Sequence, residues 1–392
     1  MYKPKQLKNN IFCVGAIDWD RRLFDELIPL PDGTSYNSYL IKGSEKTALI
    51  ETVDPTKTKV LMENLNSLNI DKIDYVIANH AEQDHSGSIP NILCKYPMAK
   101  VVCSAKCKEM LMNLLLIPED MFIEVADCEK LSLGDKTLEF IHFPWVHWPE
   151  TTLTYLIEDR ILFPCDFYGF HIASNELYVT NDELMLESAK RYYAEIMMPF
   201  RNIIKNNFPK LDKYQIDLIA PSHGPIHRKP ELIMNAYKDW TSDNVKNEVL
   251  IAYVSMHEST KKMVDYLVKA LTDRDIIVKQ FDIPHSDIGK IAISLVDAAT
   301  VIIGSPTILG GAHPYAIFAA SLASALRPKT RFASIIGSYL WGGRMVDQLV
   351  GLMPTLKAEI LTPVLAKGYP KKEDFEALDI LADSILEKHK SI

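Results

Sequence analysis

The sequence has 392 residues and a mass of 44.4 kDa, more than one ordinary hydrophobic core, so we expect two domains. With 47% hydrophobic and 24% charged residues it is typical of a globular protein, and its net charge of −8 argues against nucleic acid as the main partner. No apolar run of about 18 residues is present, so we expect no membrane-spanning helix. Six scattered cysteines favour reduced thiols in the cytoplasm over a disulfide framework.

The first part of the chain alternates short strands with turns and helices. Helices are predicted over 56–68, 105–115 and 188–208. Apolar and β-branched runs predict strands over 47–52, 75–79, 100–103, 138–143, 152–157, 160–163 and 218–220. This mixture predicts a sheet-rich, layered α/β domain over residues 1–246.

After Trp240 and a polar segment at 241–247, the rhythm becomes regular. Strands are predicted over 249–254, 277–282, 300–304, 331–336 and 359–361. Helices are predicted over 260–271, 287–297, 314–326, 344–352 and 372–389. Strands and helices in strict alternation predict a doubly wound parallel sheet of flavodoxin-like type over residues 247–392.

The run HAEQDH places four metal-ligating side chains directly after the apolar strand DYVIAN. They are His80, Glu82, Asp84 and His85. Imidazole and carboxylate ligands together suit iron, zinc or manganese, and the lack of cysteine in the run disfavours an iron–sulfur cluster. A charged surface loop with incidental histidines would give the same letters, so this run alone leaves the site open.

Three further candidates follow later strand-like stretches. His147 lies in PWVHWPE, Asp166 in LFPCDFY and His223 in APSHG. Loops that follow strands of one sheet open on a common rim, so we expect these side chains to converge with HAEQDH. His142 and His227 have the pattern of structural histidines.

The spacing H-x-E-x-D-H, then His147, then Asp166 after 18 intervening residues, then Ser-His-Gly, resembles the signature of flavodiiron proteins. The resemblance covers essentially the whole chain and implies a metallo-β-lactamase-like αββα sandwich followed by a flavodoxin-like domain. It also implies two irons. His80, Glu82 and His147 would hold one, Asp84, His85 and His223 the other, and Asp166 would bridge them. Hydrolases of this fold usually carry histidine where this chain has Glu82, so a zinc hydrolase fused to a flavodoxin is the distant alternative.

Three loops after strands of the second domain resemble those with which flavodoxins hold FMN. The first would bind the phosphate at a helix N-terminus, and the other two would flank the isoalloxazine ring, with Trp341 as a candidate for stacking. The predicted contacts are Ser255, Met256, His257, Ser259, Thr260, Ser305, Pro306, Thr307, Ile308, Gly310, Ser338, Tyr339, Trp341, Gly342 and Gly343. Flavodoxins normally have glycine where this chain has Glu258, which must point outward or accept a tighter turn.

The resemblance implies an oxidoreductase in which FMN and a di-iron centre act in sequence. Reduction of O2 to water takes four electrons, and reduction of two NO to N2O takes two. The run WDRRLFDELIPLPDGTSYNSYL looks like the methanogen branch, which implies reduced coenzyme F420 as donor and water-forming oxygen detoxification as the activity. The alternative is a rubredoxin-dependent NO reductase of the same family, and the absence of a CxxC pair predicts that no rubredoxin is fused within this chain.

Two expectations concern the assembly and the protons. The family pairs subunits head to tail, so we expect a homodimer, possibly a dimer of dimers, in which FMN of one subunit serves the iron of the other. Tyr193 and His171 are the candidate proton donors at the irons, with Tyr168 nearby and Phe24 shaping the pocket.

Overall fold

A computed structural model describes residues 3–392, which form two compact units. The first unit contains the chain up to Tyr192 together with Phe200–Lys238. The second contains Tyr193–Pro199 and Asp239–Ile392. None of the described helices is both long enough and apolar enough to cross a membrane.

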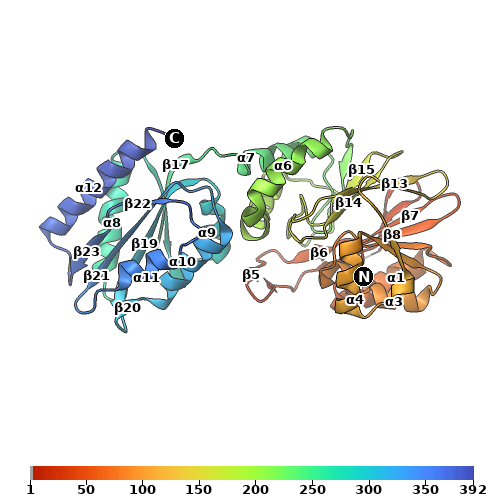
Figure 1. Cartoon of the computed structure of the whole chain (residues 1–392), viewed down its shortest axis with the longest axis horizontal. Coiled ribbons are helices and arrows are strands. Elements are labelled where there is room, and N and C mark those ends of the chain that lie inside the picture. The colour runs from red at the N-terminus through yellow and green to blue at the C-terminus, as the bar shows by residue number, and fades with distance from the viewer. Residues whose placement is uncertain (1–2) are drawn as a thin grey trace. The chain divides into compact units, whose positions relative to one another are not determined.

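Two sheets form the centre of the first unit (Figure 1). The first sheet has the strand order β1 (Lys5–Lys8), β2 (Ile11–Cys13), β7 (Tyr39–Lys42), β8 (Thr47–Ile50), β9 (Tyr75–Ile77), β10 (Lys100–Cys103) and β11 (Phe122–Glu124). The second has the order β12 (Lys130–Ser132), β13 (Thr137–His142), β14 (Thr152–Leu156), β15 (Ile161–Phe163) and β16 (Leu218–Ile219). Two short ribbons are added by β3 (Ala16–Asp18) with β6 (Thr34–Tyr36), and by β4 (Leu23–Phe24) with β5 (Ile28–Pro29).

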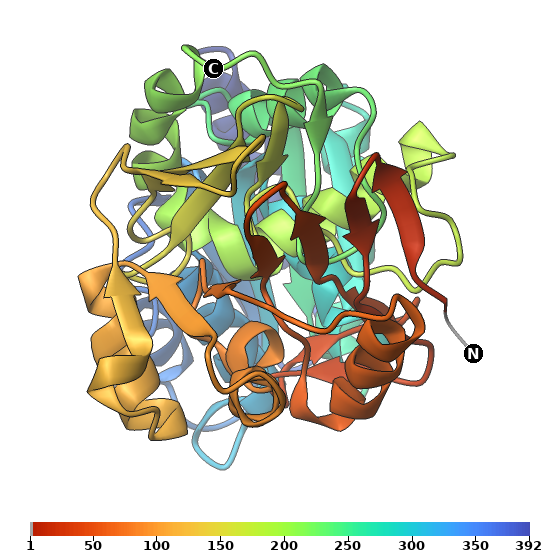
Figure 2. The same cartoon turned by 90° about the vertical axis from the view of Figure 1, so that its right-hand side faces the viewer.

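Alternate strand residues face two different cores. Leu49 and Val76 pack with the helices α1 (Thr58–Ser67), α3 (Ile89–Lys95) and α4 (Ala105–Leu115), which gather beside the first sheet in Figure 2. Ile50 and Phe140 pack between the two sheets. On the outer side, Phe167 contacts aromatic rings of α6 (Arg201–Leu211) and α7 (Pro230–Trp240). The predicted αββα sandwich is therefore confirmed.

The helix predicted over 188–208 differs from the structure. An α-helix, α5 (Asp182–Tyr192), begins earlier because acidic residues fill its first turn, where the helix dipole favours them. A π-helical turn (Tyr193–Met197) and a 3₁₀ turn (Met198–Phe200) then separate it from α6. Pro199 explains the break, since proline lacks the N–H and clashes with the carbonyl four residues earlier.

The second unit is a parallel sheet with helices on both faces. Its strands are β18 (Ile277–Asp282), β17 (Lys246–Tyr253), β19 (Ala298–Ile308) and β21 (Phe332–Tyr339), in that order. Figure 1 shows α8 (Ser259–Thr272) and α12 (Lys372–His389) on one face. The other face carries α9 (Ile288–Leu295), α10 (Pro314–Leu326) and α11 (Met345–Gly351). The flavodoxin-like doubly wound fold is confirmed.

The last strand position of this sheet is shared by two pieces. β22 (Glu359–Ile360) pairs with the start of β21, and β23 (Val364–Lys367) pairs with its end. Only the first piece was predicted. Pro363 lies between the two, and a proline cannot donate a hydrogen bond to a neighbouring strand, so the edge strand is interrupted there.

Candidate functional site

Four loops of the first unit bring the seven predicted ligands together. The HAEQDH run leaves β9 and enters a short helix, α2 (Gln83–Ser86). The other three ligands follow β13, β15 and β16. Five of the seven side chains are almost completely buried, and Glu82 and His147 are 14% and 13% exposed. The convergence of strand-end loops therefore forms one polar cluster inside an apolar domain.

The first group of ligand atoms surrounds one oxygen of Asp166. Nε2 of His80 lies 3.0 Å from Oε2 of Glu82 and 3.5 Å from Oδ2 of Asp166. Nε2 of His147 lies 3.4 Å from the same Glu82 oxygen and 3.2 Å from Asp166 Oδ2. Donor atoms at 2.0–2.2 Å from one metal ion are separated by about 3 Å, so these spacings fit a single ion.

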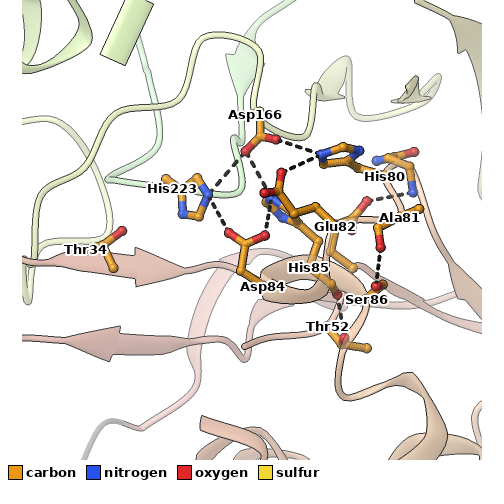
Figure 3. A network of polar contacts seen from close by, with 12 residues as sticks. Thr34, Thr52, His80, Ala81, Glu82, Asp84, His85, Ser86, Asp166 and His223 are labelled. Carbon is orange, nitrogen blue, oxygen red and sulfur yellow. Dashed lines mark hydrogen bonds and ion pairs between the residues drawn. The ribbon is translucent and has the colours of Figure 1, made fainter. Parts of the chain in front are cut away.

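The second group surrounds the other oxygen of Asp166. Oδ1 of Asp166 lies 3.0 Å from Nε2 of His85 and 3.2 Å from Nε2 of His223. Asp84 completes this group, with its oxygens 3.3 Å from the His85 nitrogen and 3.1 Å from the His223 nitrogen. Figure 3 shows Asp166 between His223 and His80. The arrangement is that of a carboxylate shared by two ligand groups.

The second group also passes a test of hydrogen bonding. Both carboxylate oxygens of Asp84, Oδ1 of Asp166, and Nε2 of His85 and of His223 are buried and have no hydrogen-bond partner among the described residues. Each of the two nitrogens lies 3.0–3.3 Å from oxygens of both carboxylates. Buried polar atoms normally have partners, so a cation is the partner that this geometry fits.

Two of the ligand histidines are oriented by hydrogen bonds at Nδ1, the ring nitrogen that faces away from the cluster. Nδ1 of His80 lies 2.7 Å from Oε1 of Glu150, which also accepts the N–H of Ala81. Nδ1 of His223 lies 2.7 Å from the carbonyl of Ser35 and donates to it. In each ring Nε2 is then left as the free ligand atom, which is how metal-binding imidazoles are usually held. Sequence reasoning identified neither Glu150 nor Ser35.

The charges of the cluster stabilise one another. Burial alone would raise the pKa of Asp166, but His85, His147 and His223 hold that pKa well below its usual range. Burial would lower the pKa of His223, yet the carboxylates of Asp166 and Asp84 raise it to about 10. The pKa of His147 is raised to about 9 by Asp166 and Glu82, against the effect of burial. The carboxylates therefore provide a strongly anionic site, which protons and metal ions compete to fill.

Tyr193, predicted as a proton donor, bonds through its hydroxyl within the second unit. Its hydroxyl donates to the carbonyl of Trp240 in the second unit, and its ring packs on that residue. The preceding residue, Tyr192, faces the cluster instead, with its ring 6.0 Å from that of His223. Burial, together with the Asp166 carboxylate, raises the pKa of Tyr192 well above its usual value, so its hydroxyl keeps its proton. Two adjacent tyrosines on a helix point in different directions, and the sequence does not say which one faces inward.

His171 lies beside the second group, with its ring 4.7 Å from that of His223. Nδ1 of His171 lies 2.8 Å from Oγ1 of Thr34, which also lies 3.3 Å from the Ser35 carbonyl. Nε2 of His171 is buried and has no hydrogen-bond partner among the described residues. Burial and the neighbouring His223 keep the pKa of His171 well below its usual value, so the ring is neutral.

Of the remaining aromatic and histidine candidates, Phe24 lies at the ligand cluster and the others make contacts elsewhere. Phe24 covers the second group, with its ring 5.2 Å from His171 and 6.2 Å from His223. Tyr168 packs on Phe167 and Tyr237. The ring nitrogens Nε2 of His142 and His227 lie 3.2 Å and 2.9 Å from main-chain carbonyls, of Val125 and Tyr168 respectively. Both histidines are structural, as their sequence pattern indicates.

In the second unit, the predicted flavin loops follow β17, β19 and β21 and lie at one edge of the sheet. The hydroxyls of Thr260 and Ser338 are 3.1 Å apart and connect the first loop to the third. β19 turns back at Gly310 into β20 (Gly311–Ala312). A Cβ atom added to Gly342 would lie 3.4 Å from the Cα of Gly310, so the second and third loops are side by side.

Two features of these loops fit a bound flat ring. Oγ1 of Thr307 is buried and has no hydrogen-bond partner among the described residues, so it is available to a ligand. Trp341 is 63% exposed on the third loop, which rules out an ordinary core tryptophan and leaves its ring face available for stacking. Gly310 and Gly342 both have positive φ, as tight loop backbones require.

Glu258 stands where flavodoxins normally have glycine, and its backbone nevertheless has the conformation that glycine favours. It keeps the left-handed conformation that glycine favours, with φ of 64°, and its side chain is exposed at the N-terminus of α8. The loop therefore has the backbone conformation typical of glycine, and the Glu258 side chain adds a carboxylate to it.

Known proteins resemble this chain over both units. Residues 34–224 match the family of ODP family beta lactamases. The chain is 33% identical to the nitric oxide reductase of Moorella thermoacetica, over 96% of each protein. It superposes on rubredoxin oxygen:oxidoreductase from Desulfovibrio gigas with a TM-score of 0.95, 28% identity and 99% coverage of both chains. For the flavodiiron protein of Giardia intestinalis the TM-score is 0.90, with 27% identity and 99% coverage of both chains.

Proposed function

Because this chain belongs to the flavodiiron protein family, whose members combine FMN with a di-iron centre, we propose that it reduces O2 to water with electrons taken from reduced coenzyme F420. The chain is an oxidoreductase of this family, and the donor and the acceptor are the proposed part. FMN would receive the electrons, and the di-iron centre would use them.

The single observation that carries the di-iron part of this proposal is the position of Asp166. Each of its oxygens faces a separate group of ligand atoms, with nitrogens at 3.0–3.5 Å. His80, Glu82 and His147 would hold one iron, and Asp84, His85 and His223 the other. Such a pair supplies one-electron redox chemistry and open positions for a diatomic molecule. Glu82, where hydrolases of this fold usually carry histidine, makes the site harder and more anionic, which favours iron over zinc.

The surrounding residues would orient the site and exclude water. Glu150 and the Ser35 carbonyl fix the rings of His80 and His223. Phe24 and Tyr192 place apolar ring surface over the second group. Tyr192 keeps the proton on its hydroxyl beside Asp166, so a hydrogen-bond donor remains next to the ligand groups.

For the second unit we propose FMN as the bound cofactor. The phosphate would lie at the N-terminus of α8, and Thr307 and Trp341 would contact the ring system. We further propose a head-to-tail homodimer, so that FMN of one subunit serves the irons of the other. The cytoplasm is the proposed location, as the cysteine usage suggests, since all six cysteines are free thiols.

A second candidate is NO reduction with rubredoxin as donor. It is favoured by the relative from Moorella thermoacetica, which is named a nitric oxide reductase. The ligand set serves either diatomic molecule, so the donor and acceptor must be tested directly.

The test is anaerobic reduction of the iron-loaded, FMN-loaded protein by reduced F420, followed by mixing with O2 or NO. We expect rapid bleaching of the flavin, then water as the product with O2. If reduced rubredoxin reduces the flavin and F420 does not, the donor assignment is wrong. Metal analysis gives a separate check, because zinc together with ester hydrolysis would support the hydrolase alternative.

A further inference from the structure

A buried glutamate lies directly behind the metal cluster and is not one of its seven ligands. Glu51 follows β8 and is only 2% exposed. Its backbone has a φ of 56°, in the left-handed region that residues other than glycine seldom adopt. Such a conformation is strained and is found mainly where surrounding structure or function requires it.

The main chain and one oxygen of Glu51 are firmly held. Its N–H donates to the carbonyl of Ile77, and its own carbonyl accepts from the hydroxyl of Ser38. Oε1 accepts the N–H of Asn79 at 2.7 Å. Asn79 directly precedes His80, so this carboxylate is attached to the segment that begins the HAEQDH run.

The other side of Glu51 faces two further ligand-bearing segments. Its carboxylate, a ring nitrogen of His85 and the sulfur of Cys165 all lie within 4.8 Å of one another, and all three residues are buried. Cys165 directly precedes the bridging Asp166. Oε2 of Glu51 is buried without a hydrogen-bond partner among the described residues. One side chain therefore contacts the segments that carry His80, His85 and Asp166.

The first ligand group already has a carboxylate of this kind. Glu150 lies behind His80, bonded to its ring and to the N–H of Ala81. Glu51 lies within 4.8 Å of a ring nitrogen of His85, with a main-chain N–H on one oxygen and no hydrogen-bond partner on the other. Each histidine of the HAEQDH run thus has a buried carboxylate near its ring, bonded to His80 and unbonded beside His85.

We propose that Glu51 is a positioning residue for the metal centre, holding the His85 and Asp166 segments and adding a negative charge behind the second ligand group. The inference rests on the proposed di-iron function. A purely structural role explains less, because a buried carboxylate oxygen without a partner is costly and an amide or apolar side chain would fill the space more cheaply. A metal ion held by His85 would give that charge a favourable partner.

The test compares Glu51→Gln with Glu139→Gln in the full-length protein. Glutamine keeps the shape and the bond to Asn79 but removes the charge. Glu139 is a matched control, since it is 8% exposed and accepts the hydroxyl of Tyr214 at 2.6 Å, and it belongs to none of the ligand groups. Both variants are loaded anaerobically with Fe²⁺, and iron content, the EPR-monitored midpoint potential and the apparent Kd for Co²⁺ are measured.

We expect E51Q to bind Co²⁺ at least ten-fold more weakly than the wild type and to have a higher midpoint potential, because loss of a negative charge favours the reduced irons. E139Q should stay within two-fold of the wild-type Kd, with an unchanged potential. Equal potentials and affinities in E51Q and the wild type would overturn the inference. If E51Q does not fold, E51D replaces it. Aspartate keeps the charge but shortens the reach, so an EPR spectrum identical to the wild type would likewise overturn it.

The outcome for the wild-type protein separates the two proposals. A wild type that fails to bind two irons would contradict the proposed function itself. A wild type with two irons, together with an E51Q that behaves identically, would contradict only the role of Glu51.

Discussion

Asp166 is surrounded by four imidazole nitrogens at 3.0–3.5 Å. The residues around it differ in how far the sequence alone could predict them. The seven ligands were predictable because each follows a strand and carries a metal-binding side chain at a recognisable spacing. Glu150 lies in the same PWVHWPE run as His147, but nothing in those letters distinguishes it. Ser35 acts through its main-chain carbonyl, for which no side-chain pattern exists.

The hydroxyls of Tyr192 and Tyr193 have different surroundings, so their removal should have different effects on turnover. Tyr192→Phe removes the hydroxyl beside Asp166 and should lower turnover with O2 about ten-fold or more, with iron content unchanged, since general acid catalysis contributes on the order of 10²–10⁴. Tyr193→Phe removes the bond to the Trp240 carbonyl and should leave turnover within two-fold. Steady-state oxygen consumption of the two variants decides this. Equal losses in both would show that neither hydroxyl is specific to the reaction.

His227 should make stability depend on pH. Burial lowers its pKa to about 4, partly offset by the Tyr168 carbonyl. Between pH 6.5 and 4 the unfolded chain binds a proton that the folded chain does not, so the free energy of unfolding falls as the pH falls through this window. At pH 5 the loss is about 2 kcal/mol, at 1.36 kcal/mol per pKa unit.

Urea unfolding of the metal-stripped protein at pH 7 and pH 5 measures this loss. His227→Gln should lose about 2 kcal/mol less than the wild type over that interval, whereas the exposed His285→Gln should match the wild type. A wild type and an H227Q variant with the same pH dependence would exclude His227 as the source.

At the scale of elements, prediction succeeded where a strand is buried and apolar. β10 has the predicted bounds, and β8, β9 and β14 differ from theirs only at the ends. Strands β1 to β7, β11 and β12 were not predicted, because all are only two to four residues long and most mix polar with apolar side chains. β7 is buried and apolar but too short to show a periodic pattern. The break between α5 and α6 was also missed, although Pro199 is visible in the sequence. Short ribbons are stabilised by tertiary contacts that local patterns do not record.

The loop between β17 and α8 gives a prediction about flavin affinity. Glu258 has a left-handed backbone at a cost of about 1 kcal/mol and places a carboxylate near the proposed phosphate site. Glu258→Gly removes both the strain and the charge and should lower the Kd for FMN about ten-fold. Glu258→Gln removes only the charge and should give a smaller gain. Fluorescence titration of the FMN-free protein measures each Kd, and weaker binding by E258G would mean that the carboxylate assists the loop.

At the scale of the whole molecule, all seven metal ligands belong to the first unit and all three flavin loops to the second. Removal of metal by a chelator should therefore lower the unfolding temperature of the first unit alone. Ligand at 1,000 times its Kd stabilises a protein by about 4 kcal/mol, which corresponds to several degrees. Scanning calorimetry of the FMN-loaded protein, with and without chelator, checks this. Equal shifts of every transition would show that the units unfold together.

Trp341 offers a practical consequence of the third flavin loop. Its side chain is mostly exposed and is followed directly by Gly342 and Gly343. An indole in that setting emits at long wavelength, and a flavin stacked on it would quench the emission by energy transfer. The difference in fluorescence between the wild type and Trp341→Phe is thus a built-in optical gauge of cofactor occupancy, readable in dilute solution and without any label.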